Sequence, residues 1–425
     1  MTRSDRAATG GCVASGLMSF RAAIALIFFL SFFVPALPSQ AAWSAQGPDA
    51  KYQAIAALNA KDYDRAIKIL EDASGSNPFD DGLKKLLGQA YSARGWAKVS
   101  SEKFDQALDD FKKARLAEPL KQAATYLGLG YASFRLKEND DALYYLEEAV
   151  GLDPKEDQAH ALLGEIYYER GSLHEAISEW EQSLQIKQDE GVKSLLAKAK
   201  KELGVEKSFT KRETYYFNVK YEGEEERELG DQVLDILYSA STSVGGDLGY
   251  YLKEPINIIL YTRQQFVDVT DAPSWSGGIF DGNIRVPVGG RVDKTALSAV
   301  LYHEFTHAVI HSMAGNRVPT WLDEGLAQYE ERWVRAPEGR IEGDLIPLSK
   351  LSGSFMKDGA GAAKQAYAES LSAVQFFVDR YGMFSLSRVL SLLGKGKGIS
   401  DAMNEAAGVT LPQFEGLWRE SLGYR

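Results

Sequence analysis

The sequence predicts a multidomain protein in which an all-α solenoid of helical repeats precedes an α+β domain. Three observations predict it. Small residues recur every 34 to 41 positions between residues 44 and 204, the spacing of stacked helical hairpins. Beyond residue 206, segments of period two alternate with segments of helical period. An apolar run of thirteen residues lies ahead of both parts. We place the boundaries at 1–42, 43–205 and 206–425.

Composition limits the classes of partner. The chain has 48 basic and 59 acidic residues, a formal net charge of -11. Without residues 1–42 there are 45 basic and 58 acidic residues, a net charge of -13. Phosphate backbones attract basic surfaces, so this charge argues against a nucleic-acid or anionic-membrane binder. The only cysteine is Cys12. It precedes the apolar run, so the mature chain has no disulfide and no thiolate ligand.

Residues 1–42 have the layout of a secretory signal peptide. The run AAIALIFFLSFFV at 22–34 follows Arg21 and is too short to span a bilayer comfortably as a helix. We expect cleavage after Ala41 or Ala42, giving a periplasmic or secreted protein without a stable membrane span. An uncleaved anchor helix is the alternative. Met18 is a possible true start, because MSFR would give a more usual charged segment before the run.

The repeat pattern is carried by small, large and proline positions in a fixed order. The small residues are Ala66, Ala107, Ala142 and Ala176, and each is followed four residues later by Leu70, Phe111, Leu146 or Trp180. Proline closes the first three units. A period of 34 in this order resembles the tetratricopeptide repeat. The first interval has extra residues, so we expect a lengthened helix at 83–100, and a capping helix at 189–203.

The repeats have two possible roles. Arrays of this kind present a concave groove, so a protein partner or peptide bound there is the leading hypothesis. The alternative is a packing scaffold for the second domain. His160 and His174 lie on repeat helices without a ligand set around them, and we interpret both as ordinary helix residues.

The second domain begins with a mixed sheet lobe, residues 213–292. We predict a strand at 215–221, a helix at 225–243 and a buried strand at 256–261. Thr262 and Gln265 form a capping box for a short helix. Two brief strands at 277–280 and 284–288 flank Asp281, Gly282 and Asn283, which is a hairpin signal.

Pro287 marks the second strand of that hairpin as a predicted edge, because proline donates no ladder hydrogen bond. An edge beside an active site could pair with an extended peptide as one more strand. The alternative is a protected edge that pairs with nothing.

HEFTH at 303–307 carries the strongest chemical signal. The window Asp293–Met313 reads as a helix, with Asp293 or Thr295 as N-cap. Residues four apart share a helix face, so His303 and His307 can point at one centre. Zinc takes such nitrogen ligands and usually a third protein ligand. A turn at Pro319 can bring Glu324 of WLDEGLA alongside. A structural helix with hydrogen-bonded histidines is the alternative.

HEFTH followed by WLDEGLA resembles the gluzincin metallopeptidases of the MA type. The resemblance implies that His303, His307 and Glu324 bind one zinc ion and that Glu304 is the general base. With the repeats, the chain resembles bacterial tetratricopeptide-repeat proteins that carry a peptidase MA domain. The predicted helices of the site span 293–333, and a helical C-terminal subdomain spans 345–425. Another divalent metal in place of zinc remains open.

Three further residues are candidates for supporting roles. Tyr367, in a predicted helix at 365–382, is our candidate second donor to the developing oxyanion, with His311 as the weaker one. Either could instead have a structural role. Asp323 either orients a histidine N–H or is a solvated acid favoured by the helix dipole.

Two functions follow from these observations. The leading one is an exported zinc metallopeptidase whose repeats recruit a substrate or partner protein. The alternative is a non-catalytic interaction scaffold of the cell envelope with a degenerate or structural metal domain. The presence of all four core residues favours the first.

Overall fold

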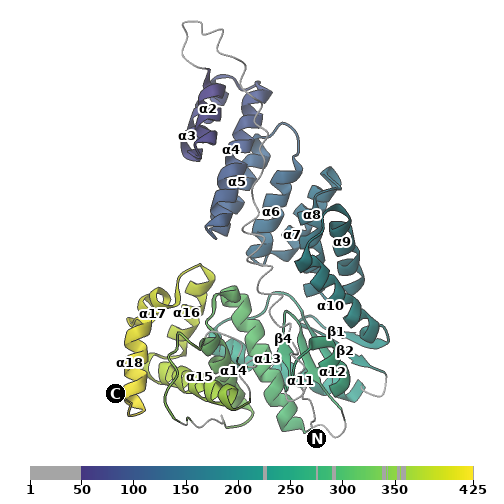
Figure 1. Ribbon diagram of the computed structural model, residues 1–425, viewed down its shortest axis with the longest axis vertical. Helices are drawn as coiled ribbons and strands as arrows, with labels where there is room; N and C mark the ends of the chain where they lie inside the picture. The colour runs from purple at the N-terminus through teal and green to yellow at the C-terminus, as the bar shows by residue number, and fades with distance from the viewer. Residues whose placement is uncertain are drawn as a thin grey trace, which may run out of the picture. The chain divides into compact units, whose positions relative to one another are not determined.

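The computed structural model describes residues 49–223, 227–273, 276–289, 293–336, 341, 343–351, 355 and 360–424. The predicted signal peptide lies outside these residues. Two compact units are present (Figure 1). The repeat unit comprises the described residues up to Tyr168 together with Ser172–Lys200, and the C-terminal unit comprises Glu169–Gly171 with Lys201 onwards. The division falls inside a helix, a little before the predicted boundary at 205.

The repeat unit consists of consecutive helices that pack as antiparallel pairs. Their bounds are α2 Ala50–Asn59, α3 Tyr63–Ser76, α4 Asp81–Ser100, α5 Phe104–Ala117, α6 Ala123–Arg135, α7 Asn139–Leu152, α8 Asp157–Glu169, α9 Leu173–Ile186 and α10 Glu190–Glu206. The predicted lengthening of the second repeat is confirmed, because α4 has 20 residues. The predicted cap is α10, which begins at Glu190 and runs on to Glu206.

Small residues let the paired helices approach closely, as the repeat pattern predicts. Ala176 is fully buried on α9, and the indole of Trp180 donates to the carbonyl oxygen of Ala161 on α8 at 3.1 Å. A Cβ atom added to Gly164 would lie 2.4 Å from Trp180 Nε1. The glycine is therefore required by the volume of the indole rather than by its own backbone angles.

The repeat unit also buries a charge. Asp110 on α5 is 1% exposed. Both of its oxygens accept from the guanidinium of Arg94, at 2.7 and 2.8 Å, and Lys98 Nζ lies 2.7 Å from Oδ2. These cations hold the pKa of Asp110 below its usual range against the opposing effect of burial. The buried carboxylate is thus fully satisfied.

The C-terminal unit opens with a five-stranded mixed sheet of order β1-β2-β3-β5-β4. The strands are β1 Phe209–Glu213, β2 Phe217–Glu222, β3 Ile256–Tyr261, β4 Ile279–Phe280 and β5 Ile284–Pro287. β3 lies between β2 and β5, parallel to both. Helices α11 Arg227–Leu248 and α12 Arg263–Thr270 cover different residues of β3, so every residue of INIILY is buried. Apart from Asn257 its sequence is apolar, which reflects burial on both faces.

Two sheet predictions need correction. β1 lies in a charged segment just ahead of the strand predicted at 215–221 and was not predicted, and it pairs antiparallel with β2 at one edge of the sheet. The strand containing Pro287 is not an edge, because β5 pairs with β3 on one side and β4 on the other. The ladder with β4 covers only Ile284 and Arg285, so the missing N–H of Pro287 falls beyond it. The edge strand on this side of the sheet is β4.

The elements of the candidate site follow the sheet. The capping box of Thr262 and Gln265 is present, and the predicted hairpin turns at Gly282, whose φ is +102°. α13 Lys294–Ala314 starts at the predicted N-cap, since the Asp293 carboxylate accepts from the Thr295 backbone N–H at 3.0 Å. The short helix η3 Gly315–Arg317 leads to α14 Thr320–Glu330 and η4 Glu331–Trp333.

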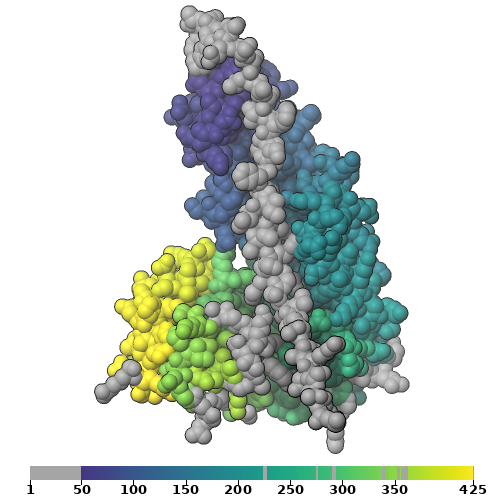
Figure 2. Space-filling model, viewed as in Figure 1, coloured from purple at the N-terminus to yellow at the C-terminus, as the bar shows by residue number. Residues whose placement is uncertain are grey.

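The remaining helices complete one core. They are α15 Ala360–Tyr381, α16 Met383–Gly394, α17 Ile399–Ala407 and α18 Leu411–Ser421. Their buried faces join those of the sheet, α11, α13 and α14 in a single apolar cluster. The last helices, in yellow, lie beside α15 in the space-filling view (Figure 2). None of the helices in the described ranges has the length and hydropathy needed to cross a bilayer.

Candidate metal centre

The two histidines of HEFTH lie one turn apart on α13, and the apolar stripe beside them fixes which way they face. Leu301, Phe305 and Val309 are buried in the core. That burial orients the helix, so His303 and His307 face α14 rather than the sheet. Their ring centroids lie 4.8 Å apart at an interplanar angle of 78°.

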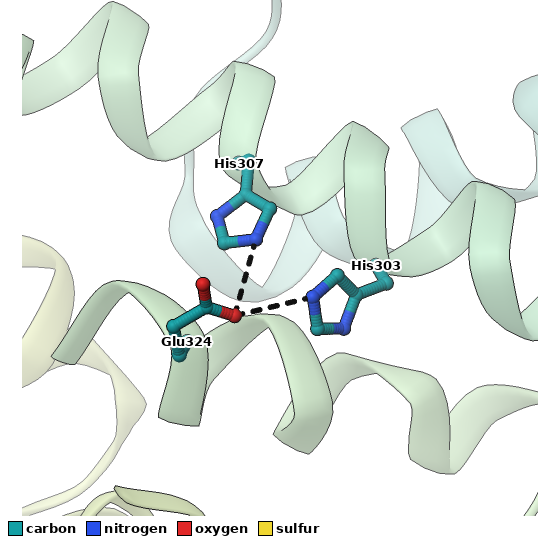
Figure 3. A group of neighbouring side chains, drawn as sticks. All are labelled: His303, His307 and Glu324. Carbon is teal, nitrogen blue, oxygen red and sulfur yellow. Dashed lines mark ion pairs between the residues drawn. The ribbon is translucent and has the colours of Figure 1, made fainter. Parts of the chain in front are cut away.

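Glu324 reaches this pair from α14 (Figure 3). Its Oε2 lies 3.4 Å from His303 Nε2 and 3.6 Å from His307 Nε2. These separations exceed those of good hydrogen bonds. Oε2 is buried and has no hydrogen-bond partner in the described residues. The fold thus brings together the three residues predicted to bind a metal ion.

The donor set fits a metal ion. The three ligand atoms lie within 4.8 Å of one another. Atoms bound tetrahedrally to zinc at about 2.0–2.2 Å lie roughly 3.3–3.6 Å apart, and Glu324 Oε2 lies 3.4 and 3.6 Å from the two Nε2 atoms. Two imidazoles and one carboxylate are ligands that zinc accepts, and a metal ion would satisfy the orphaned oxygen of Glu324.

The carboxylates and imidazoles of this cluster shift one another's pKa values. Burial lowers the pKa of His303, but the carboxylates of Glu324 and Glu331 outweigh burial and raise that pKa to about 9. Burial raises the pKa of Glu324, but the two histidines that face its carboxylate bring the pKa down to about 2. The cluster therefore favours positive charge at the point where the three donors meet.

Each histidine turns its other ring nitrogen to a carboxylate. His307 Nδ1 lies 2.7 Å from Asp323 Oδ1, and His303 Nδ1 lies 3.0 Å from Glu331 Oε1. Such a contact fixes the tautomer and leaves each Nε2 lone pair free for a metal. Of the two roles weighed for Asp323, contact with a histidine is the one seen. Glu331 was not predicted; it lies in the short helix η4 beyond α14, where no periodic signal marked it.

His311, the weaker candidate for the oxyanion donor, already has a hydrogen-bond partner. Its Nε2 lies 2.8 Å from Asp323 Oδ2, and its ring meets the edge of Phe280 with centroids 5.6 Å apart. That nitrogen is already paired, so it is a poor candidate for an oxyanion donor.

Glu304 is buried beside the histidine pair. Burial raises the pKa of its carboxyl, although His303 and His307 oppose the effect. A Cβ atom added to Gly278 would lie 2.9 Å from Glu304 Oε1, so the carboxylate packs against the backbone that leads into β4. A carboxyl group with a raised pKa, next to a strand edge, is suited to accept and donate a proton.

Tyr367 lies on α15, near enough to Glu324 and Glu304 for their charges to act on its phenol. Burial raises the pKa of its phenol well above the usual value, and the charges of Glu324 and Glu304 add to the rise. Its ring contacts Phe355 edge-on, with centroids 5.2 Å apart. The phenol therefore stays protonated and able to donate.

Backbone contact fixes α14 against α15. A Cβ atom added to Gly325 would lie 2.3 Å from the carbonyl oxygen of Ser370. Gln328 donates to the carbonyl oxygen of Tyr367 at 3.1 Å. The glycine that follows Glu324 thus lets the two helices touch beside the site.

Comparison with known proteins agrees with this architecture. The model of the peptidase MA superfamily matches residues 239–423. Two tetratricopeptide-repeat models match residues 92–157 and 133–199. The comparison with curated proteins gives no match.

Solved structures similar to the chain are repeat proteins. YrrB, described as a TPR protein with an unusual peptide-binding site, is 21% identical, covers 35% of this chain and 82% of its own, and has a TM-score of 0.28. MamA AMB-1 is 21% identical, with 36% and 81% covered and a TM-score of 0.29. A thermophilic TPR protein of Thermus thermophilus is 22% identical, with 35% and 79% covered and a TM-score of 0.25. The family models thus show a peptidase MA superfamily domain at residues 239–423, with tetratricopeptide repeats ahead of it.

Proposed function

We propose that the protein is an exported, zinc-dependent metallopeptidase of the gluzincin type. The observation that carries the proposal is the buried, unpartnered oxygen of Glu324 facing His303 Nε2 and His307 Nε2. These three residues would hold one zinc ion. The match to the peptidase MA superfamily supports peptide-bond hydrolysis as the reaction.

The chain's own residues divide the chemistry between them. A bound zinc ion would supply Lewis acidity, lowering the pKa of water and polarising the scissile carbonyl. Glu304 takes the proton of the attacking water and passes it to the leaving amine, which its raised pKa favours. Tyr367 donates from its protonated phenol to the oxyanion that develops on the substrate. Hydrolysis then needs no nucleophilic side chain.

β4 is the strand that suits an extended substrate. It forms the sheet edge, and the approach through Gly278 lies against Glu304. A peptide added there as a further strand would bring its backbone to the general base. This replaces the strand of Pro287, which is paired on both sides over part of its length.

Tetratricopeptide repeats mediate protein–protein interaction. We propose that these repeats recruit the substrate or a partner protein. The apolar run at 22–34 supports export and periplasmic or extracellular action after cleavage.

The test is metal content. Residues 43–425, produced without a histidine tag, are analysed for bound elements beside His303→Ala and His174→Ala. We expect about one zinc per chain in the wild type, its loss in His303→Ala and its retention in His174→Ala, because His174 is exposed on α9. Hydrolysis of a mixture of quenched fluorescent peptides should follow the zinc content.

A wild type that takes up no metal after reconstitution would contradict the proposal. The interaction scaffold would then be the better description. Binding of another divalent metal in preference to zinc would keep the site and change the cofactor.

A further inference from the structure

The carboxylates behind the two histidines are themselves held in place. On one side, Glu331 accepts from His303 with Oε1 and from the guanidinium of Arg335 with Oε2, at 2.9 Å from Nε and 2.6 Å from Nη2. The carboxylate is thus fixed at both oxygens. Its outer donor is a permanent cation whose side chain is 46% exposed.

The other side has the same plan with different chemistry. Asp323 accepts from His307 with Oδ1 at 2.7 Å and from His311 Nε2 with Oδ2 at 2.8 Å. His311 lies one turn beyond His307 on α13, so a single helix carries both the inner and the outer partner. The Asp323 side chain is only 15% exposed, which leaves water little access to replace His311.

His307, His311 and Asp323 also lie close enough together to be considered a second metal group. Their contacts argue against it. Separations of 2.7 and 2.8 Å are those of hydrogen bonds, shorter than the roughly 3.3–3.6 Å between atoms that share a tetrahedral metal. A second ion would also require His307 to lose both ring protons. The three residues are therefore a chain of hydrogen bonds.

We propose that His311 is a positioning residue that acts on His307 through Asp323. By donating to Oδ2, it prevents rotation of the carboxylate and keeps Oδ1 facing His307 Nδ1. That contact fixes the tautomer of His307 and aims Nε2 at the metal position. The inference rests on the proposed function, because it assigns His311 a task only if His307 binds a metal.

Phe280 gives the outer histidine its own support. Its ring, on edge strand β4, meets the His311 ring at an interplanar angle of 65° with centroids 5.6 Å apart. His311 therefore has its ring position set by packing and its Nε2 committed to Asp323. Both features are expected of a group that orients another.

The experiment compares two amides at position 311 in the chain 43–425. The amide nitrogen of His311→Gln reaches about as far as Nε2 of histidine, whereas that of His311→Asn is too short to reach Asp323. Each protein is loaded with Zn²⁺ alone, and release of zinc to a coloured chelator is followed in time. Ser312→Ala is the matched control, because the Ser312 hydroxyl donates only to the carbonyl of Ala308 on the same helix.

We expect His311→Asn to release zinc about tenfold faster than wild type, within the range found when groups behind metal ligands are removed. His311→Gln and Ser312→Ala should stay within about twofold. At saturating zinc, kcat for the peptide mixture should fall in the Asn variant while KM stays within about twofold. Thermal unfolding of the metal-free proteins should be similar for both amides.

Equal zinc release by the Asn variant and the wild type would overturn the inference. So would equal acceleration in both amide variants, since the donor would then not matter. Either result leaves zinc binding and turnover by the wild type intact, and with them the proposed function. A wild type without zinc would instead overturn both.

Discussion

The two units differ in how completely their buried carboxylates are paired. In the repeat unit, Asp110 is 1% exposed and both of its oxygens are paired with Arg94 and Lys98. In the C-terminal unit, Glu324 keeps one oxygen buried without a hydrogen bond in the described residues, and Glu304 is buried with a raised pKa. A buried charge that is paired on all sides serves the fold. One left unsatisfied is expected to serve a ligand or a reaction.

Replacing each acid by its amide tests this contrast, and the largest effect should come from Glu304→Gln. The amide cannot accept a proton from water, so hydrolysis of the peptide mixture should fall by about 10³-fold. Zinc content should stay at about one per chain. The unfolding temperature of the metal-free protein should not fall, because burial of an amide costs less than burial of a carboxylate. Turnover that survives this change would refute the assigned base.

Asp110→Asn is the counterpart in the repeat unit. It leaves Arg94 and Lys98 without their buried anion and should lower the free energy of unfolding of that unit by about 3 kcal/mol. Urea unfolding followed by circular dichroism would measure the change. Zinc stabilises only the unit that binds it, so the transition unaffected by added zinc belongs to the repeats. A large loss of zinc or of peptide hydrolysis in this variant would contradict a purely structural role for Asp110.

Gly164→Ala tests packing in the repeat unit without any charge. Its new methyl group would lie 2.4 Å from Trp180 Nε1, and Trp180 is fully buried. We expect a loss of about 2 kcal/mol in the same unfolding experiment. Gly151→Ala on α7 is the matched control, because nothing lies within 4 Å of its added Cβ. That change should stabilise the helix by about 0.5 kcal/mol. Equal effects of both alanines would contradict the packing argument.

Glu118 differs from Asp110, because it is an incompletely paired acid in the repeat unit. Thr125 donates to its Oε1 at 2.8 Å, while Oε2 is buried without a partner in the described residues. Burial raises the pKa of Glu118 to about 7 against the smaller effect of Thr125. The folded state therefore holds the proton more tightly than the unfolded state.

Because the pKa of Glu118 is raised in the folded state, the stability of the repeat unit falls as the pH rises. Stability conferred by the protonated Glu118 is complete below its unfolded pKa of about 4.5 and is lost as the pH rises toward 7. Allowing for partial exposure, the loss should be about 1–2 kcal/mol. Glu118→Gln should remove this slope and be more stable than wild type at pH 8 but not at pH 4.5. Parallel pH profiles for the two proteins would show that Glu118 does not titrate in this window.

Periodicity predicted most elements of the fold because burial produces it. β3, the hairpin at Gly282 and α13 occur within a residue or two of their predicted bounds. β1 was missed because its outer edge is free to carry charged residues, so its sequence resembles a linker. The edge assignment of Pro287 failed because strand pairing over Ile284 and Arg285 is a tertiary property that one proline does not encode.

The candidate site was predictable where its spacing is helical. His303 and His307 share a helix face, and WLDEGLA supplied Glu324. Glu331 lies on the short helix η4, where a spacing of seven residues has no fixed geometric meaning. Its contact with His303 depends on how that turn is placed against α13, which no local pattern reports.

Gly325 limits which amino-acid substitutions such a domain tolerates beside its candidate metal site. The residue next to Glu324 touches the carbonyl of Ser370, three residues beyond Tyr367, with no room for a methyl group. Any larger side chain there would push apart the two helices that carry these groups, altering both at once. Variation at this position is therefore tolerated only together with a compensating change on α15. Libraries that aim at new substrates should hold Gly325 fixed or randomise it jointly with the residues around Ser370.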